Sequence, residues 1–443
     1  MKTPMAFAVV SLFAGSLATV SVRAQVPPLH HYKITDLGAV GATPGQPFHL
    51  ASNGFIAGAL TRDGGVEHAV VWSERLGNQP LDLGTFSGGI NSIAFGVNRW
   101  GQVTGESDTN TPDPNGEDFC GFAALGLTSS GTTCLPAIWQ GGAIHKLPTL
   151  TAANGIHGNN GVANVINSWD QVAGLAENTT FDTTCATQDT ATGWTQKLQQ
   201  KPVLWEFGFI HELPTVGGDP DGAALANSDT GFVAGGSGIC GPFDPLNFLN
   251  LQFTHAILWD HGRAIDLGNL GGSFGNVAFG VNNRGDAAGG SDVTDDTATL
   301  GFLWTKESGR MHPLAPAGTD IISTALALND SRQVVGVSVD ENFNTKAAIW
   351  TAGMSSATDL NTLIPSSSGL YLVLACGINE DGQIIGLAVD TSGVAHGYLA
   401  SPSGEGLDHE DLEHGAMGPI KLPEYVREQL RKQLPFGKRH KAY

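Results

Sequence analysis

Seven copies of one motif follow one another along the chain, and this repetition limits the folds that the chain can adopt. Each copy has an apolar segment centred on leucine, then a segment that ends in glycine. A short apolar run follows, and in six copies it closes on tryptophan. The final glycines are Gly58, Gly105, Gly174, Gly235, Gly289, Gly336 and Gly386. We therefore interpret residues 25–400 as one domain built from a repeated unit.

Each copy contains the residues of four short strands. Runs of about five residues rich in Val, Ile and aromatic residues have the length and composition of strands. Between two of these runs lies the sequence N-x-x-G or a near variant, in which Asn suits the first position of a type I turn and Gly its fourth. The 60 glycines and the charged content of only 14% also favour many tight turns over helices.

The period of the repeat predicts the architecture. Successive final glycines are 47, 69, 61, 54, 47 and 50 residues apart, so the basal period is near 47 residues. Four strands in such a period are typical of a propeller blade. We predict an all-β fold, a seven-bladed β-propeller of four-stranded blades. The N-terminal segment "KITDLG" should join the last blade as its outer strand, which closes the ring and leaves no exposed sheet edge.

The repeats resemble those of the HAF-repeat family, extracellular proteins named after a His-Ala-Phe run. The resemblance rests on residues 82–108 and 266–292, which share the order Asp-Leu-Gly, Ala-Phe-Gly-Val-Asn and Gly-x-Ser-Asp. It also rests on the runs "HAVVW" (68–72) and "HAILW" (255–259). It covers roughly residues 33 to 400, and it implies export and a propeller-like fold. It implies no reaction and no catalytic residue.

Both ends of the chain fall outside the repeats. Residues 1–24 have the features of a cleaved signal peptide, with Lys2 ahead of an apolar run and a small-residue cleavage site after Ala24. Residues 401–443 are predicted to form a linker and a short helix or disordered tail, which we expect to carry no hydrophobic anchor. One face of this helix would carry Leu422, Val426, Leu430 and Leu434.

The mature chain is acidic. Loss of Lys2 and Arg23 with the signal peptide takes the formal net charge from −20 to −22. This balance argues against a nucleic-acid partner, because phosphate binding requires concentrated Lys and Arg.

The apolar run of the signal peptide is too short to span a membrane, and no comparable run follows it. We expect a monomer that is secreted, periplasmic or at the cell surface, with a protein or a glycan as its partner.

Three consecutive copies differ from the others in one loop. From the final glycine to the end of the tryptophan run there are 14 or 15 residues in copies one, five, six and seven. In copies two, three and four there are 34, 31 and 24. Four cysteines lie in these loops, and we expect Cys120 to pair with Cys134 and Cys185 with Cys240 in an oxidising compartment. Cys376 is expected to be a buried thiol. Loops of this length often carry function, and the alternative is that they only cap one face.

Two tryptophans and three acidic residues are candidate binding residues. Trp100 and Trp169 replace polar residues in the N-x-x-G turns of copies two and three. Exposed there, they would stack on sugar rings or anchor a protein partner; the alternative is packing between adjacent blades. Glu106 and Glu177, interpreted as equivalent positions, follow the glycine-ended strands of the same copies, and Asp108 lies nearby. A carboxylate pair is what a glycosidase requires, and the alternative is a solvated rim.

The loop of copy two has the oxygen-rich composition that calcium prefers. Asp108, Asn110, Asp113 and Asn115 are the candidate ligands, although their spacing does not match an EF-hand loop. We favour the alternative, a solvated acidic loop, and therefore expect no cofactor. The glycine-rich stretch 266–292 is not a phosphate-binding loop, because its glycines open no predicted helix and no GK[ST] sequence follows them.

The sequence favours an exported binding or scaffold module at or outside the cell surface, with the long loops of copies two to four as its recognition surface. The competing interpretation is a secreted carbohydrate-active enzyme, a glycosidase or lyase on a propeller scaffold. One geometric feature separates the two, because an enzyme of this kind requires acidic side chains that converge within about 5–10 Å in a pocket.

Overall fold

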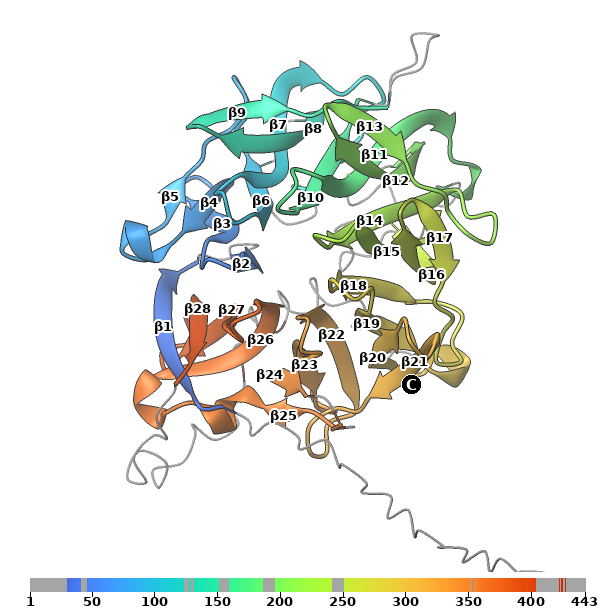
Figure 1. The fold of residues 1–443 in the computed structure, drawn as a ribbon. Helices are drawn as coiled ribbons and strands as arrows, with labels where there is room; N and C mark the ends of the chain where they lie inside the picture. Colours follow the sequence, from blue (N-terminus) through green and yellow to red (C-terminus); the bar gives the residue numbers. More distant parts are fainter. Residues whose placement is uncertain are drawn as a thin grey trace, which may run out of the picture.

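Seven four-stranded antiparallel sheets stand as blades around a central axis (Figure 1). The predicted seven-bladed β-propeller is therefore confirmed. The computed structural model describes residues 30–40, 46–122, 127–128, 131–150, 159–185, 196–240, 251–351, 353–354, 356–403, and Leu422, Glu424 and Arg427. The predicted signal peptide, residues 1–24, and most of the predicted tail, residues 401–443, lie outside this description.

In the first six blades the chain runs from the innermost strand to the outermost. Blade one contains β2 (Gln46–Leu50), β3 (Ile56–Arg62), β4 (Val66–Trp72) and β5 (Leu81–Asp82), with the 3-10 helix η1 (Glu74–Leu76) between the last two. Blade two contains β6 (Ser92–Val97), β7 (Val103–Pro112), β8 (Thr132–Gln140) and β9 (Ala143–Lys146). Blade three contains β10 (Gly161–Ile166), β11 (Val172–Phe181), η2 (Thr183–Cys185), β12 (Leu198–Glu206) and β13 (Phe209–Glu212).

The remaining blades repeat this order. Blade four contains β14 (Asp221–Asn227), β15 (Phe232–Cys240), β16 (Leu251–Asp260) and β17 (Arg263–Asp266). Blade five contains β18 (Val277–Val281), β19 (Ala287–Asp292), η4 (Thr294–Asp296), β20 (Thr299–Thr305) and β21 (Arg310–Leu314). Blade six contains β22 (Ile322–Leu328), β23 (Val334–Val339), β24 (Thr345–Trp350) and β25 (Thr358–Asp359). After η5 (Leu360–Leu363) and η6 (Ser366–Ser368), blade seven begins with β26 (Leu370–Ile378), β27 (Ile384–Asp390) and β28 (Ala395–Pro402).

The outer strand of blade seven comes from the other end of the chain. Strand β1 (Tyr32–Ala39) pairs antiparallel with β28, from Tyr32 opposite Pro402 to Ala39 opposite His396. The two strands lie side by side at the junction of the first and last blades (Figure 1). Because the first and last strands of the domain share one sheet, their hydrogen bonds close the ring.

The tryptophans that end the apolar runs tie neighbouring blades together. Each is at most 5% exposed: Trp72, Trp139, Trp205, Trp259, Trp304 and Trp350. In blade four, Trp259 Nε1 donates a hydrogen bond to the carbonyl of Pro214, which follows the outer strand of blade three, at 2.8 Å. Trp205 and Trp350 make the same kind of bond to the preceding blade. The repeated tryptophan is thus a structural residue.

The His-Ala and Asp-Leu-Gly elements also have structural roles, because they meet across neighbouring strands. His68 Nδ1 lies 2.9 Å from Asp82 Oδ2 in blade one, and His396 Nδ1 lies 3.0 Å from Asp36 Oδ1 in blade seven. Each of these aspartates also accepts a hydrogen bond from the backbone N–H of the glycine two residues later, which shapes the turn.

In four blades the asparagine of the N-x-x-G turn or its near variant links its own turn to the next blade. Asn98 Oδ1 accepts hydrogen bonds from the backbone N–H groups of Trp100 and Gln102, and its amide donates to the carbonyl of Asn167 in the next blade at 3.2 Å. Asn167, Asn282 and Asn329 repeat this bond to the following blade. The amide also donates to the side chain four residues on, which is glutamine in four copies: Gln102, Gln171, Gln333 and Gln383.

Each innermost strand has a β-bulge at the same place in the repeat. The register with the second strand skips one residue at this place in every blade, and blade seven skips a second residue, Val373. The residues skipped at the shared place are Phe48, Phe95, Asn164, Leu225, Phe279, Leu326 and Cys376, and all seven line the central channel. Cys376 is a free thiol as predicted, but it is only half-buried because it faces this channel.

One residue of the C-terminal segment belongs to the propeller core. Leu422 is 1% exposed and packs in a cluster of buried side chains from blades one, six and seven, including Leu60, Ile322 and Tyr371. The expectation that this segment carries no hydrophobic anchor is therefore wrong at this residue. Burial of a leucine side chain contributes about 2 kcal/mol, enough to hold the chain at this point.

Candidate binding surface

The long loops of blades two to four are cross-linked as predicted. Disulfide bonds join Cys120 to Cys134 within blade two and Cys185 in blade three to Cys240 in blade four. The backbone N–H of Cys240 also donates to Thr184 Oγ1 at 3.0 Å. The second disulfide and this hydrogen bond thus join blades three and four.

A buried pair of carboxyl groups joins the loop of blade two to blade three. Glu117 accepts hydrogen bonds from the backbone N–H groups of Lys197 and Leu198, at the start of β12. Glu177 is fully buried, and its Oε2 accepts from Asn160 Nδ2 at 2.8 Å. Burial raises the pKa of both carboxyls, and for Glu177 the adjacent Glu117 adds to the rise. A shared proton between them therefore stabilises this contact.

The sheet register corrects one interpretation made from the sequence. Glu106 lies opposite Pro136 and Asp108 opposite Cys134, whereas Glu177 lies opposite Gln200, two residues before the proline equivalent to Pro136. The counterpart of Glu177 in blade two is therefore Asp108, not Glu106. The spacing from the final glycine to the glutamate differs by two residues between the copies, so the two glutamates are not equivalent.

Glu106 and Asp108 are also buried inside blade two. Glu106 is 4% exposed, its Oε2 lies 3.4 Å from Cys134 Sγ, and burial raises its pKa well above the usual range. Asp108 Oδ1 accepts hydrogen bonds from the backbone N–H groups of Ile90 and Asn91, at 2.7 and 2.9 Å. Neither residue lines either of two cavities that lie along the central channel.

The predicted calcium ligands have different partners. Asp113 Oδ1 accepts from the backbone N–H groups of Asn115 and Glu117, and its Oδ2 accepts from Asn160, whereas Asp108 is bonded to the start of β6. Asn110 is exposed. The carboxylate oxygens thus face amide donors, and these bonds do not gather the four side chains around one point.

Two other groups of potential metal ligands lie close together among the described residues. They are Glu106 with Cys120 and Cys134, and Asp182 with Cys185 and Cys240. In both groups the two sulfurs are already joined in a disulfide bond. Metal ligation by cysteine requires a thiolate, so these groups do not have the donors of a thiolate metal site.

Trp100 and Trp169 lie at the opposite end of the blades from the long loops. Each sits in the turn before the second strand of its blade, whereas the long loop follows that strand. The two side chains are 65% and 67% exposed. Trp100 Nε1 donates to the carbonyl of Ser168 in blade three at 3.2 Å, and the guanidinium of Arg99 lies 4.6 Å from the centre of the Trp100 ring. The indole is thus oriented by the next blade and still open to solvent.

Two phenylalanines on the same face were not predicted as binding residues from the sequence. Phe207 and Phe209 flank the turn between β12 and β13 and are 89% and 68% exposed. Strands β11 and β12 pair with Val172 opposite Trp205, so this turn and the Trp169 turn lie at one end of blade three. Their signal was the break in the repeat, since blade four has the polar pair His261 and Gly262 where blade three has Phe207 and Gly208.

Polar side chains connect neighbouring turns on this face. Gln171 Nε2 donates to Glu206 Oε2 at 2.9 Å, which ties the Trp169 turn to the turn that carries Phe207. In blade two, Gln102 Nε2 donates to Gln140 Oε1 at 3.0 Å. We define Trp100, Trp169, Phe207 and Phe209 as the aromatic patch. Among the described residues, one further aromatic side chain, Phe181, is exposed outside this patch.

No family model matches the chain, and no curated protein matches it either. Similar solved structures include an oligogalacturonate lyase from Vibrio parahaemolyticus, with 10% identity, a TM-score of 0.46 and coverage of 86% of this chain and 94% of that one. A gluconolactonase from Xanthomonas campestris has 8% identity and a TM-score of 0.36, over 84% and 90% of the two chains. The propeller domain of a protease from Pyrococcus furiosus has 8% identity and a TM-score of 0.38, over 85% and 96%. These likenesses concern the propeller architecture alone.

Among the described residues, none of the helical segments has the length and apolar character needed to cross a lipid bilayer.

Proposed function

We propose that this protein is an exported binding module that holds a glycan chain on the aromatic patch of blades two and three. The observation that carries the proposal is the exposure of four aromatic side chains, 65% to 89%, on one face of two adjacent blades. Large exposed aromatic side chains cost solvation free energy unless a ligand covers them, and such patches mark interaction sites. The two disulfides and the resemblance to extracellular HAF-repeat proteins support export.

The spacing of polar and aromatic groups favours a glycan over a protein partner. The core of a protein interface is a continuous apolar area from which charged groups are depleted. Here the rings stand on three turns. The amides of Gln102, Gln140 and Gln171, the carboxylate of Glu206 and the guanidinium of Arg99 lie at the same end of blades two and three. A sugar ring has an apolar face that packs on an aromatic ring and hydroxyl groups that hydrogen-bond to amides. A chain of sugars would therefore match this combination of aromatic and polar groups.

The enzyme interpretation has less support from the geometry. Glycoside hydrolysis needs two carboxyl groups that face a substrate. Glu106 and Glu177 are at most 4% exposed, and Glu177 is hydrogen-bonded inside the brace between blades two and three. Recognition by the long loops stays a prediction for the segments of these loops that lie outside the described residues.

A glycan array probed with the full mature chain tests the proposal, followed by titration of the best ligand. We expect Trp100→Ala with Trp169→Ala, and separately Phe207→Ala with Phe209→Ala, to weaken binding at least tenfold. Phe181→Ala is the matched control, since Phe181 is 60% exposed but lies at the other end of β11. Unchanged affinity in both patch variants would overturn the proposed site. A patch-dependent protein partner with no glycan ligand would show that the ligand class is wrong.

A further inference from the structure

The central channel contains a cavity of about 330 Å³ that is separate from the aromatic patch. Its walls come from the innermost strands of all seven blades. This volume lies at the lower end of the range typical of small-molecule sites, about 300–1,000 Å³. The strands that frame the channel surround the centre of Figure 1.

The bulge residues that line the channel are mostly apolar, and Asn164 is the one with an amide side chain. Phe48 and Phe95 meet edge to face with ring centroids 5.2 Å apart, and Phe279 stands on the wall of blade five. Leu225 and Leu326 flank Phe279 on the neighbouring blades. Asn164 Nδ2 donates to the carbonyl of Ala224 at 2.9 Å. No lysine, arginine, aspartate or glutamate is among the described residues that line this cavity.

Two neutral polar side chains also line the cavity, His49 in blade one and Asn227 in blade four. His49 Nδ1 accepts a hydrogen bond from the backbone N–H of Val97 at 3.3 Å, so its Nε2 carries the proton. Burial lowers the pKa of His49 to about 4, which keeps the imidazole neutral near pH 7. Asn227 Nδ2 donates to the carbonyl of Gln171, while its buried Oδ1 has no hydrogen-bond partner among the described residues. An unpaired buried acceptor costs about 1–3 kcal/mol unless something donates to it.

The cavity opens toward the face that carries the N-x-x-G turns. A second hollow of about 160 Å³ shares His49, Asn227, Val281 and Leu328 with the cavity, among other residues. Its rim consists of turn residues, which include Asn98, Asn167 and Asn282 and the charged Arg99, Asp229 and Glu380. A small molecule can therefore reach the apolar wall through a polar entrance.

We propose that this channel cavity is a binding site for a small uncharged molecule of one or two aromatic ring systems that carries a hydrogen-bonding group. The rings pack against Phe48, Phe95 and Phe279. The polar group satisfies Asn227 Oδ1 as a donor or His49 Nε2 as an acceptor. Net charge on the ligand is excluded because the wall offers no counter-ion and burial of an unpaired charge is costly. This site is independent of the glycan proposed for the aromatic patch.

The neutral dye N-phenyl-1-naphthylamine is a suitable probe, because its rings and single N–H match the cavity and its fluorescence rises in apolar surroundings. We expect it to bind the full mature chain with micromolar affinity. Its sulfonated relative, 1-anilinonaphthalene-8-sulfonate, should bind at least tenfold more weakly. Leu225→Trp with Leu326→Trp fills the channel and should weaken dye binding at least tenfold. Leu76→Trp with Leu81→Trp is the matched control, since both leucines are exposed on blade one.

Wild-type protein supplies a second measurement if the channel-filling variant does not fold. Cys376 lines the cavity and is the free cysteine of the chain. Bound dye should slow its reaction with 4,4′-dithiodipyridine by at least threefold. Absence of dye binding, or binding that leaves the thiol reaction unchanged, would overturn the proposal. Dye binding that Trp100→Ala with Trp169→Ala abolishes would place the dye on the aromatic patch and also overturn it.

Discussion

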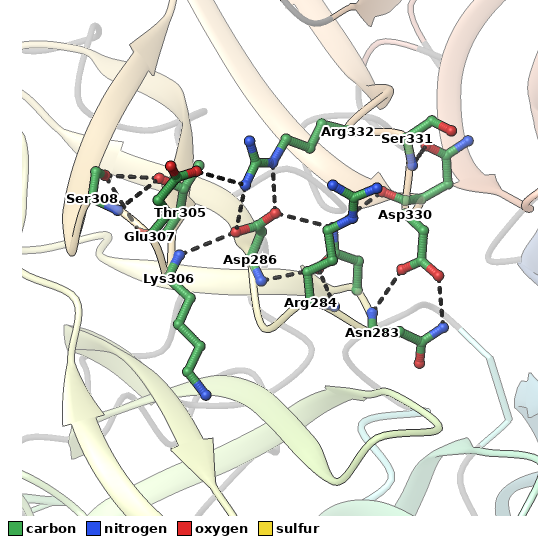
Figure 2. Close-up of polar contacts among 12 residues, drawn as sticks. Asn283, Arg284, Asp286, Thr305, Lys306, Glu307, Ser308, Asp330, Ser331 and Arg332 are labelled. Carbon is green, nitrogen blue, oxygen red and sulfur yellow. Dashed lines mark hydrogen bonds and ion pairs between the residues drawn. The ribbon is translucent and has the colours of Figure 1, made fainter.

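The guanidinium of Arg332 in blade six lies against the carboxylate of Asp286 in blade five, with Nε 2.7 Å from Oδ2 (Figure 2). The Asp286 side chain is 1% exposed and that of Arg332 is 28% exposed. Asp286 occupies the repeat position that holds glutamine in four other blades, and Asn282 donates to it in the same way. A charged substitution in one repeat is thus compensated by a cation from the next blade.

This pair predicts an asymmetric response to mutation. Arg332→Ala leaves a buried carboxylate without its cation and should destabilise the protein by about 2 kcal/mol, since Arg332 is partly solvated. Asp286→Gln restores the residue of the other repeats and should cost less than about 1 kcal/mol, because Arg332 can turn to solvent. Chemical denaturation of both variants and of the double variant measures this. Equal losses in the two single variants would contradict the explanation.

The fourth position of the turn in blade three predicts a stabilising substitution. Asp170 has a φ of 63°, where the equivalent Gly101 and Gly285 have 80° and 77°. A residue with a side chain pays about 1 kcal/mol or more for this left-handed conformation, although aspartate pays less than most. Asp170→Gly should therefore raise the free energy of unfolding by about 0.5 kcal/mol.

Arg332 also occupies this turn position, with a φ of 58°, and serves as the control. Arg332→Gly relieves the same strain but removes the bond to Asp286, so it should destabilise the protein. Thermal unfolding of the two glycine variants side by side makes the comparison. A lower midpoint for Asp170→Gly would show that the aspartate has a role of its own in the turn.

The buried carboxyls predict a fall in stability as the pH rises. Burial raises the pKa of Glu177 well above its unfolded value of about 4.3. A raised folded pKa gives stability that is fully present below the unfolded pKa and is lost as the pH rises through the folded pKa. Burial similarly raises the pKa of Glu67 and Asp221 to about 9. The free energy of unfolding should therefore decrease between pH 5 and pH 9.

Glu177→Gln isolates one contribution to this pH dependence, because an amide mimics the protonated acid. The variant should unfold at nearly the wild-type temperature at pH 5 and at a higher temperature than wild type at pH 8. Exposed Glu74→Gln is the matched control and should leave the profile unchanged. A profile for Glu177→Gln that coincides with wild type would mean that Glu177 does not titrate as described.

The two disulfides should differ in their contribution to stability. Cys185 and Cys240 are 55 residues apart and join two blades, whereas Cys120 and Cys134 are 14 apart within one loop. The loop-closure relation assigns about 4 kcal/mol to the first and about 3 kcal/mol to the second. Replacing each pair by alanine and measuring urea unfolding tests the order. A larger loss from the Cys120–Cys134 pair would show that local packing outweighs chain entropy here.

The architecture could be predicted from the sequence because the same local sequence motifs recur in each blade. The buried tryptophans, the Asn turns and the Leu segments each act over a few residues and recur at one period, so seven copies reinforced one interpretation. The predicted cysteine pairs followed in the same way, since the cysteines lay in the loops that broke the period.

The functional surfaces depend on contacts between copies, which a linear repeat does not display. Glu177 interacts with Glu117 because the loop of blade two reaches blade three. The sheet register shows that the residue of blade two equivalent to Glu177 is Asp108. Phe207 joins the face of Trp100 only once antiparallel pairing brings two turns to one end of the blade. The sequence alone determined the period, the strands and the number of blades, because hydrogen-bonding and burial patterns within a repeat are local. Only the closed ring decided which side chains share a face or a channel, because those distances depend on how all seven blades pack.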